Sequence, residues 1–179
     1  MLHPWKRVWK SRAIAPFVLV GLAIALILAW PVRAIAQDII RYPIPNSTFP
    51  IALAVELPAD ANLVYVSGQV PPLVNSEADP NSVEAFGDTQ TQTVNVIERI
   101  QTILTSLDLS LSDVVKMQVF LVGDPSMDGK MDFAGFMAGY TQYFGTEEQP
   151  NLPARSAMQV AGLVNPGWLV EIEVVAVRS

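Results

Sequence analysis

The chain has 179 residues, of which 51% are hydrophobic and 16% are charged, with 11 basic and 17 acidic residues. It contains no cysteine, and its one histidine is His3. These counts exclude disulfides and a thiol nucleophile, and beyond residue 3 they exclude a Ser-His-Asp triad and a histidine metal site. No metal site is predicted, so any catalysis must use arginine, lysine, carboxylate, tyrosine, hydroxyl or backbone groups.

The first 36 residues have the pattern of a targeting segment. A basic stretch, MLHPWKRVWKSR, precedes an uncharged stretch at residues 13–32, and Ala34 and Ala36 then fit a small-residue cleavage site. Residues 1–36 are therefore predicted to be a signal peptide, or an N-terminal membrane anchor if residues 13–32 are retained. Either alternative places the remainder outside the cytoplasm, in the periplasm or the extracellular space, with membrane contact only through this segment.

Setting residues 1–36 aside changes the charge balance. Five of the 11 basic residues and none of the 17 acidic residues lie there, so residues 37–179 carry six basic residues and a formal net charge of −11. An acidic domain is a poor partner for a phosphate backbone, and no nucleic-acid partner is predicted.

The sequence that follows residue 36 predicts a linker and then a hairpin. Residues 37–50 contain three prolines and are predicted to be a linker that leads into a domain at 51–179. Two apolar runs, 51–57 and 63–67, flank the turn-forming residues 58–62, which predicts a β-hairpin. A polar loop follows.

Helices and strands alternate in the rest of the chain. Apolar residues recur at helical spacing over 89–107 and again from Phe133 to Phe144, where Gly145 is expected to end the second helix. Strands are predicted at 114–122, 154–160 and 169–177. The order ββαβαββ indicates an α+β domain in which two helices cover one face of a sheet.

The last strand has two different faces. Its even-numbered positions are wholly apolar, which suits packing under the helices: Val170, Ile172, Val174 and Ala176. Its odd-numbered positions combine apolar residues with two carboxylates: Leu169, Glu171, Glu173, Val175 and Val177. A mixed face of this kind is predicted to be buried between subunits.

Arg155 and Glu171 are the candidate functional pair, and both are expected on the sheet face away from the helices. One interpretation is a cross-strand ion pair. The other is a site, because a guanidinium binds a carboxylate in a bidentate manner and a nearby carboxylate can orient water or move a proton. Ser67, with the backbone of SGQVP, could add donors to the same cleft.

Five segments resemble the YjgF/Rid family of reactive intermediate deaminases: VYVSGQVP, DVVKMQVFLV, MDFAGFMAGYTQYF, LPARSAMQVAGL and LVEIEVVAV. The resemblance implies a chorismate-mutase-like fold and a homotrimer with a site at each subunit interface. It implies cofactor-free hydrolysis of 2-imino acids, or their enamine tautomers, to 2-keto acids and ammonia. Arg155 matches the family's carboxylate-binding arginine, Glu171 its water-positioning glutamate, and Ser67 and Gly68 its cleft-lining residues.

Three positions depart from the family pattern. Ile51, or at best Phe49, stands where a tyrosine is usual, Met137 stands for an asparagine, and Ala157 for a cysteine. A more apolar pocket is therefore expected. A non-catalytic trimeric protein that binds a small carboxylate remains the alternative to the deaminase.

Overall fold

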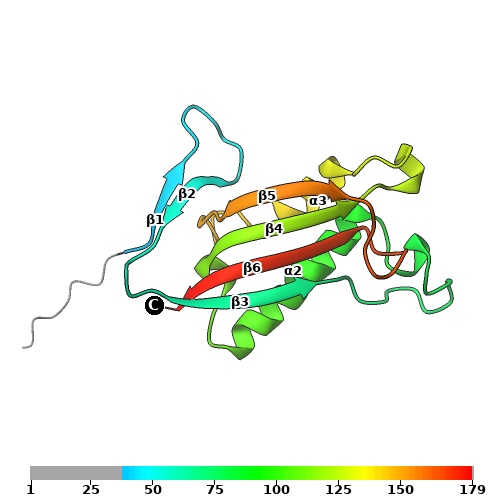
Figure 1. Ribbon diagram of the computed structural model, residues 1–179, viewed down its shortest axis with the longest axis horizontal. Coiled ribbons are helices and arrows are strands. Elements are labelled where there is room, and N and C mark those ends of the chain that lie inside the picture. The colour runs from blue at the N-terminus through cyan, green and yellow to red at the C-terminus, as the bar shows by residue number, and fades with distance from the viewer. Residues whose placement is uncertain (1–37, 179) are drawn as a thin grey trace, which may run out of the picture. The chain divides into compact units, whose positions relative to one another are not determined.

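The computed structural model describes residues 38–178, so the predicted targeting segment lies outside the described residues. These residues form a six-stranded sheet with two α-helices on one face (Figure 1). Within this range no helix is long and apolar enough to cross a membrane. The elements are β1 (Ile40–Pro43), β2 (Ala52–Glu56), β3 (Asn62–Gln69), α2 (Thr89–Ser106), β4 (Val114–Val122), α3 (Phe133–Tyr140), β5 (Ala154–Val160) and β6 (Val170–Arg178), with short 3-10 turns at Val83–Ala85, Leu111–Asp113 and Pro125–Met127.

The strands lie in the order β1-β2-β5-β4-β6-β3. The central strand β4 runs parallel to β5 and antiparallel to β6, and β3 is the outer strand beyond β6. Helices α2 and α3 lie behind the sheet in Figure 1, so the face toward the viewer carries no helix. The α+β class and the placement of both helices on one face are confirmed.

The predicted hairpin between 51–57 and 63–67 is wrong. Strand β2 pairs with β1 along its length and touches β5 at one register position, Ala52 opposite Ala154. Strand β3 pairs with β6, at the other end of the strand order. The two strands lie within two residues of the expected bounds, but they pair with other strands and not with each other.

The segment predicted as a linker contains the extra strand β1, which Arg41 fixes to the rest of the domain. The Arg41 guanidinium donates three hydrogen bonds of 2.8–2.9 Å to the backbone carbonyl oxygens of Ser112, Val114 and Leu152. Burial of this guanidinium lowers the pKa of Arg41, which the nearby Asp113 carboxylate partly offsets. A strand of four residues is thereby held against the body of the fold.

The core lies between the sheet and the two helices. The four apolar even-numbered residues of β6 are buried there, as the alternation predicted: Val170, Ile172, Val174 and Ala176. On the other face of β6 the prediction is partly wrong, because Leu169 and Val177 are already buried within one chain. Glu171, Glu173 and Val175 remain half-exposed on the open face.

Helix α3 ends at Tyr140, five residues before Gly145, where the sequence predicted its end. The Phe144 ring stacks on the Tyr140 ring, with the two ring centroids 4.9 Å apart.

Gln92 joins helix α2 to the strand that follows the 165–169 turn. Its side chain is fully buried; Nε2 donates to the carbonyl oxygens of Gly87 (2.8 Å) and Gly167 (3.0 Å), and Oε1 accepts from the Leu169 amide (2.7 Å). The amide therefore satisfies three buried backbone groups that have no neighbouring strand to pair with.

Replacing Gln92 by alanine should lower the free energy of unfolding by about 3 kcal/mol, because three buried backbone groups lose their partner. Urea unfolding followed by circular dichroism measures the change. Gln101→Ala, on the exposed side of the same helix, is the control and should alter stability by about 0.5 kcal/mol or less. Equal losses in the two variants would contradict this role for Gln92.

Candidate functional site

Arg155 points to the helix side of the sheet. In the β4–β5 ladder it lies opposite Met117, and Met117 lies opposite Val174 in the β4–β6 ladder. Met117 and Val174 are both buried in the core under the helices. Residues that are register partners share a face, so Arg155 extends toward α3 and not, as expected from the sequence, to the open face.

The guanidinium of Arg155 lies among aromatic rings. Its Cζ is 4.2 Å from the centroid of the Tyr140 ring, 4.9 Å from that of Phe136 and 5.6 Å from that of Phe49. Nη2 is 3.2 Å from the Sδ of Met137, which is a weak acceptor. Stacking on aromatic faces stabilises a cation, and a planar guanidinium suits such contacts.

One nitrogen of this guanidinium lacks an acceptor. Nη1 of Arg155 is buried and has no hydrogen-bond partner within residues 38–178. Burial lowers the pKa of Arg155, while the adjacent Tyr140 side chain raises it. An arginine nevertheless remains charged at neutral pH, so a buried cationic donor is left unsatisfied. Such a group is costly unless an anion binds to it.

Tyr140 contacts both the Arg155 guanidinium and the chain segment that carries Phe49. Burial raises the pKa of Tyr140 to about 12, although the Arg155 cation opposes the rise, so the hydroxyl keeps its proton at neutral pH. That hydroxyl donates a 3.0 Å hydrogen bond to the carbonyl oxygen of Pro50. The ring thus supports the guanidinium, and the hydroxyl fixes the segment that carries Phe49.

Glu171 lies on the opposite, open face. It pairs in register with Phe120, three residues along β4 from the partner of Arg155. An ion pair between Arg155 and Glu171 within one chain is therefore excluded, and so is a small ligand that touches both. The Glu171 carboxylate packs instead on Gly68, where a Cβ would overlap its Oε1. Gly68 is needed here for the close approach of a side chain, since its φ is not in the left-handed region.

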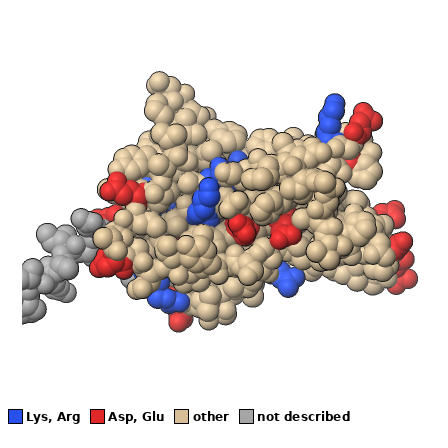
Figure 2. All heavy atoms as spheres, viewed as in Figure 1, with Lys and Arg blue, Asp and Glu red and all other residues tan. Residues whose placement is uncertain are grey.

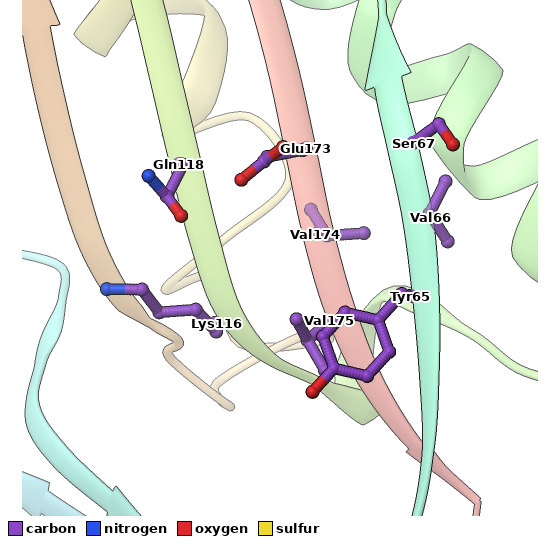
Figure 3. A pocket seen from close by; sticks show the side chains of 8 residues that line it. All are labelled: Tyr65, Val66, Ser67, Lys116, Gln118, Glu173, Val174 and Val175. Atoms are coloured by element: carbon purple, nitrogen blue, oxygen red, sulfur yellow. The ribbon is translucent and has the colours of Figure 1, made fainter.

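Ser67 precedes Gly68 in an irregular part of the β3–β6 ladder, between Val66 and Gln69. It borders a shallow pocket of about 300 Å³ on the open face (Figure 3). Figure 3 shows Gln118 of β4 beside Glu173 of β6, its partner in the ladder, with Lys116 further along β4. Ser67, Gly68 and Glu171 therefore lie on one face, as the sequence indicated.

The candidate residues thus form two groups in one chain. We call Arg155 with Phe49, Phe136, Met137 and Tyr140 the arginine half-site, and Ser67, Gly68 and Glu171 the glutamate half-site. Two of the three departures from the family pattern, Phe49 (the second choice for the first position) and Met137, contact or face Arg155 directly. The contribution of Phe136 and Tyr140 was missed, because their helical spacing indicated only core packing.

Neither half-site resembles a metal centre. Among residues 38–178 there is no group of three or more His, Cys, Asp or Glu side chains that could hold a metal ion.

Comparison with known proteins identifies relatives of similar length. A family model described as endoribonuclease L-PSP matches residues 50–178. A RutC family protein of Haemophilus influenzae is 36% identical over 135 residues, which cover 75% of this chain and 92% of the relative. A protein of Escherichia coli K12 named "Putative reactive intermediate deaminase TdcF" is 34% identical over 135 residues, with the same coverage of 75% and 92%.

Solved structures show the same fold. The crystal structure of E. coli TdcF with bound serine has 31% sequence identity and a TM-score of 0.51, and the match covers 80% of this chain and 99% of that one. A Yersinia pestis member of the Rid family, YyfB, has a TM-score of 0.59 at 22% identity, over 79% of this chain and all of the other, and supports the fold alone. From the family match and these relatives, the chain belongs to the YjgF/Rid family, whose sequence model is described as endoribonuclease L-PSP.

Proposed function

We propose that this protein hydrolyses 2-imino acids, or their enamine tautomers, to 2-oxo acids and ammonia. The observation that carries the proposal is the buried Nη1 of Arg155, a charged donor with no acceptor within the described residues. A substrate carboxylate would supply two acceptors in the planar geometry that a guanidinium favours. The similarity to TdcF, which has been crystallised with bound serine, supports a ligand that carries a carboxylate beside a nitrogen-bearing carbon.

The two half-sites would then meet between subunits of a homotrimer. Arg155 and Glu171 lie on opposite faces of one sheet, so a site that uses both must combine two copies. The open face is suited to contact with a second copy, because Leu63, Tyr65 and Met158 expose 41%, 75% and 38% of their surface. Figure 2, which views this face, shows mostly uncharged side chains, with basic and acidic side chains close together near its centre.

The chemistry follows from the two half-sites. Arg155 holds the carboxylate and fixes the imine carbon, and Glu171 of the next copy accepts a proton from water as its oxygen bonds to that carbon. The resulting carbinolamine has a tetrahedral carbon. Glu171 returns the proton to nitrogen and then carries the hydroxyl proton to the same nitrogen, so the C–N bond breaks with ammonia as the leaving group while the C=O bond forms. One imine and one water therefore become one 2-oxo acid and one ammonia.

A small-molecule substrate fits this chain better than RNA, despite the description of the family model. Residues 37–179 have six basic against 17 acidic residues, and a phosphate backbone would be repelled by this excess of negative charge. From the pattern of residues 1–36, we also propose that the reaction takes place outside the cytoplasm.

A non-catalytic carboxylate-binding protein is the second candidate. It is favoured by the contacts of Phe49 and Met137 with Arg155, because these side chains occupy space beside the guanidinium and bring no acid, base or hydroxyl. This protein would keep the arginine half-site and need no water beside Glu171.

Ammonia release separates the two candidates. Imines generated in place by an amino-acid oxidase should lose ammonia faster with the wild-type protein than without it. Glu171→Gln should lower kcat by at least about 100-fold and keep carboxylate affinity, since it removes the base and leaves Arg155, which binds the carboxylate, in place. Arg155→Ala should abolish both turnover and binding. Wild-type binding without any acceleration would establish the second candidate.

Mixing two inactive variants tests the shared site. Co-expressed Arg155→Ala and Glu171→Gln chains that assemble at random should regain about a quarter of wild-type activity, because one interface in four combines two intact half-sites. Each variant alone should stay inactive. An inactive mixture, shown by mass spectrometry to contain mixed trimers, would overturn the site between subunits.

Gly68→Ala tests the placement of Glu171. The added methyl would overlap the Glu171 carboxylate, which must turn away, so kcat should fall at least about tenfold while carboxylate affinity and folding are kept. Gly162→Ala is the matched control, since a Cβ there meets nothing within 4 Å. Unchanged kcat in Gly68→Ala would remove Glu171 from the reaction.

A further inference from the structure

A cavity of about 340 Å³ lies between the N-terminal segment and the body of the domain. Seven of its twelve lining residues are apolar: Pro43, Ile44, Phe49, Ile51, Ala52, Pro150 and Leu152. Its volume falls in the range of small-ligand sites, which are mostly apolar with a few polar groups at the margin. The remaining lining residues carry polar groups: Arg41, Tyr42, Ser47, Thr48 and Asn151.

Phe49 links this cavity to Arg155. Its ring lines the cavity and also lies 5.6 Å from the Cζ of Arg155. A carboxylate bound at the unsatisfied Nη1 would therefore have its carbon substituent within reach of the Phe49 ring. The cavity and the arginine half-site therefore share one wall, the Phe49 ring.

The wall formed by residues 40–49 is held in place on both sides. Arg41 binds three backbone carbonyl oxygens of the domain, and Tyr42 donates a hydrogen bond from its hydroxyl to Glu56. At the other end, the Pro50 carbonyl accepts from Tyr140, and the Ala52 amide donates to the Pro153 carbonyl at 3.0 Å. The wall is thus a built part of the structure.

This wall precedes the segment that the family model matches. The family model matches residues 50–178, whereas Arg41, Ile44, Thr48 and Phe49 precede that region. The cavity therefore depends in part on residues that precede the family-model match.

We propose that this cavity is a subsite for the side chain of the substrate, and that it selects carboxylates with a branched aliphatic or aromatic side chain. The inference rests on the proposed function, because Arg155 must hold the carboxylate for the side chain to enter the cavity. Phe49 is the specificity-determining residue, since it borders both the guanidinium and the apolar walls. Each buried methylene adds to affinity, whereas a methyl substituent leaves most of the cavity unused.

Calorimetry on the full assembled protein tests the subsite without requiring turnover. Three 2-oxo acids serve as stable probes: pyruvate, 4-methyl-2-oxopentanoate and phenylpyruvate. The two bulky acids should bind at least about tenfold more tightly than pyruvate, as three or more additional carbons enter the apolar space. Thr48→Trp, which fills the cavity from an exposed position, should remove this preference and leave pyruvate affinity within about twofold.

Two further variants complete the test. Phe49→Ala should weaken binding of the bulky acids at least about fivefold by removing the shared wall. Leu53→Ala is the matched control, because Leu53 is an exposed apolar residue of β2 that does not line the cavity, and it should change no affinity. Thr48→Trp fills the cavity, whereas Phe49→Ala removes one of its walls. If one of these two variants misfolds, the other still tests the subsite.

The outcomes separate the subsite from the carboxylate site. Equal affinity for all three acids, with binding lost in Arg155→Ala, would overturn the subsite and leave the arginine half-site intact. A preference that persists in Thr48→Trp would also overturn it. No binding of any acid to the wild-type protein would overturn both the subsite and the proposed function.

Discussion

The buried guanidinium of Arg155 is the constraint on which the rest of the site depends. A cation inside a protein needs compensation, and here aromatic rings provide part of it while one nitrogen stays without an acceptor. Helix α3 supplies Phe136 and Met137 and, about one turn later, Tyr140, whose hydroxyl fixes the segment before β2. The second helix is therefore a support for one charged group as much as a cover for the sheet.

The sheet then separates the functional groups. Strand β5 directs Arg155 toward the helices, and β6 directs Glu171 toward the open face, because side chains alternate and the two residues differ in register. One folded chain thus presents two incomplete sites on opposite sides of a single layer. Symmetric association is the simplest way to bring such halves together.

Strong periodicity explains which parts of the fold were predictable. Helix α2, strand β4 and the apolar face of β6 were predicted within a few residues, because each has one continuous buried side. Strand β5 has no such side, so its alternation could not show which face met the helices, and Arg155 was assigned to the wrong one. The prediction of a hairpin between β2 and β3 was wrong for another reason. The pairing of β2 depends on Arg41, whose contacts lie more than 70 residues away.

The hydrogen bonds of Arg41 also show that the folded domain begins before the segment that the family model matches. The family-model match begins at residue 50, but the folded unit begins about ten residues earlier. A protein cut at the family boundary would leave the carbonyl oxygens of Ser112, Val114 and Leu152 without their donor and would expose Ala52, now only 4% accessible. Laboratory work with a fragment that begins at residue 50 would therefore characterise a different, weakened molecule.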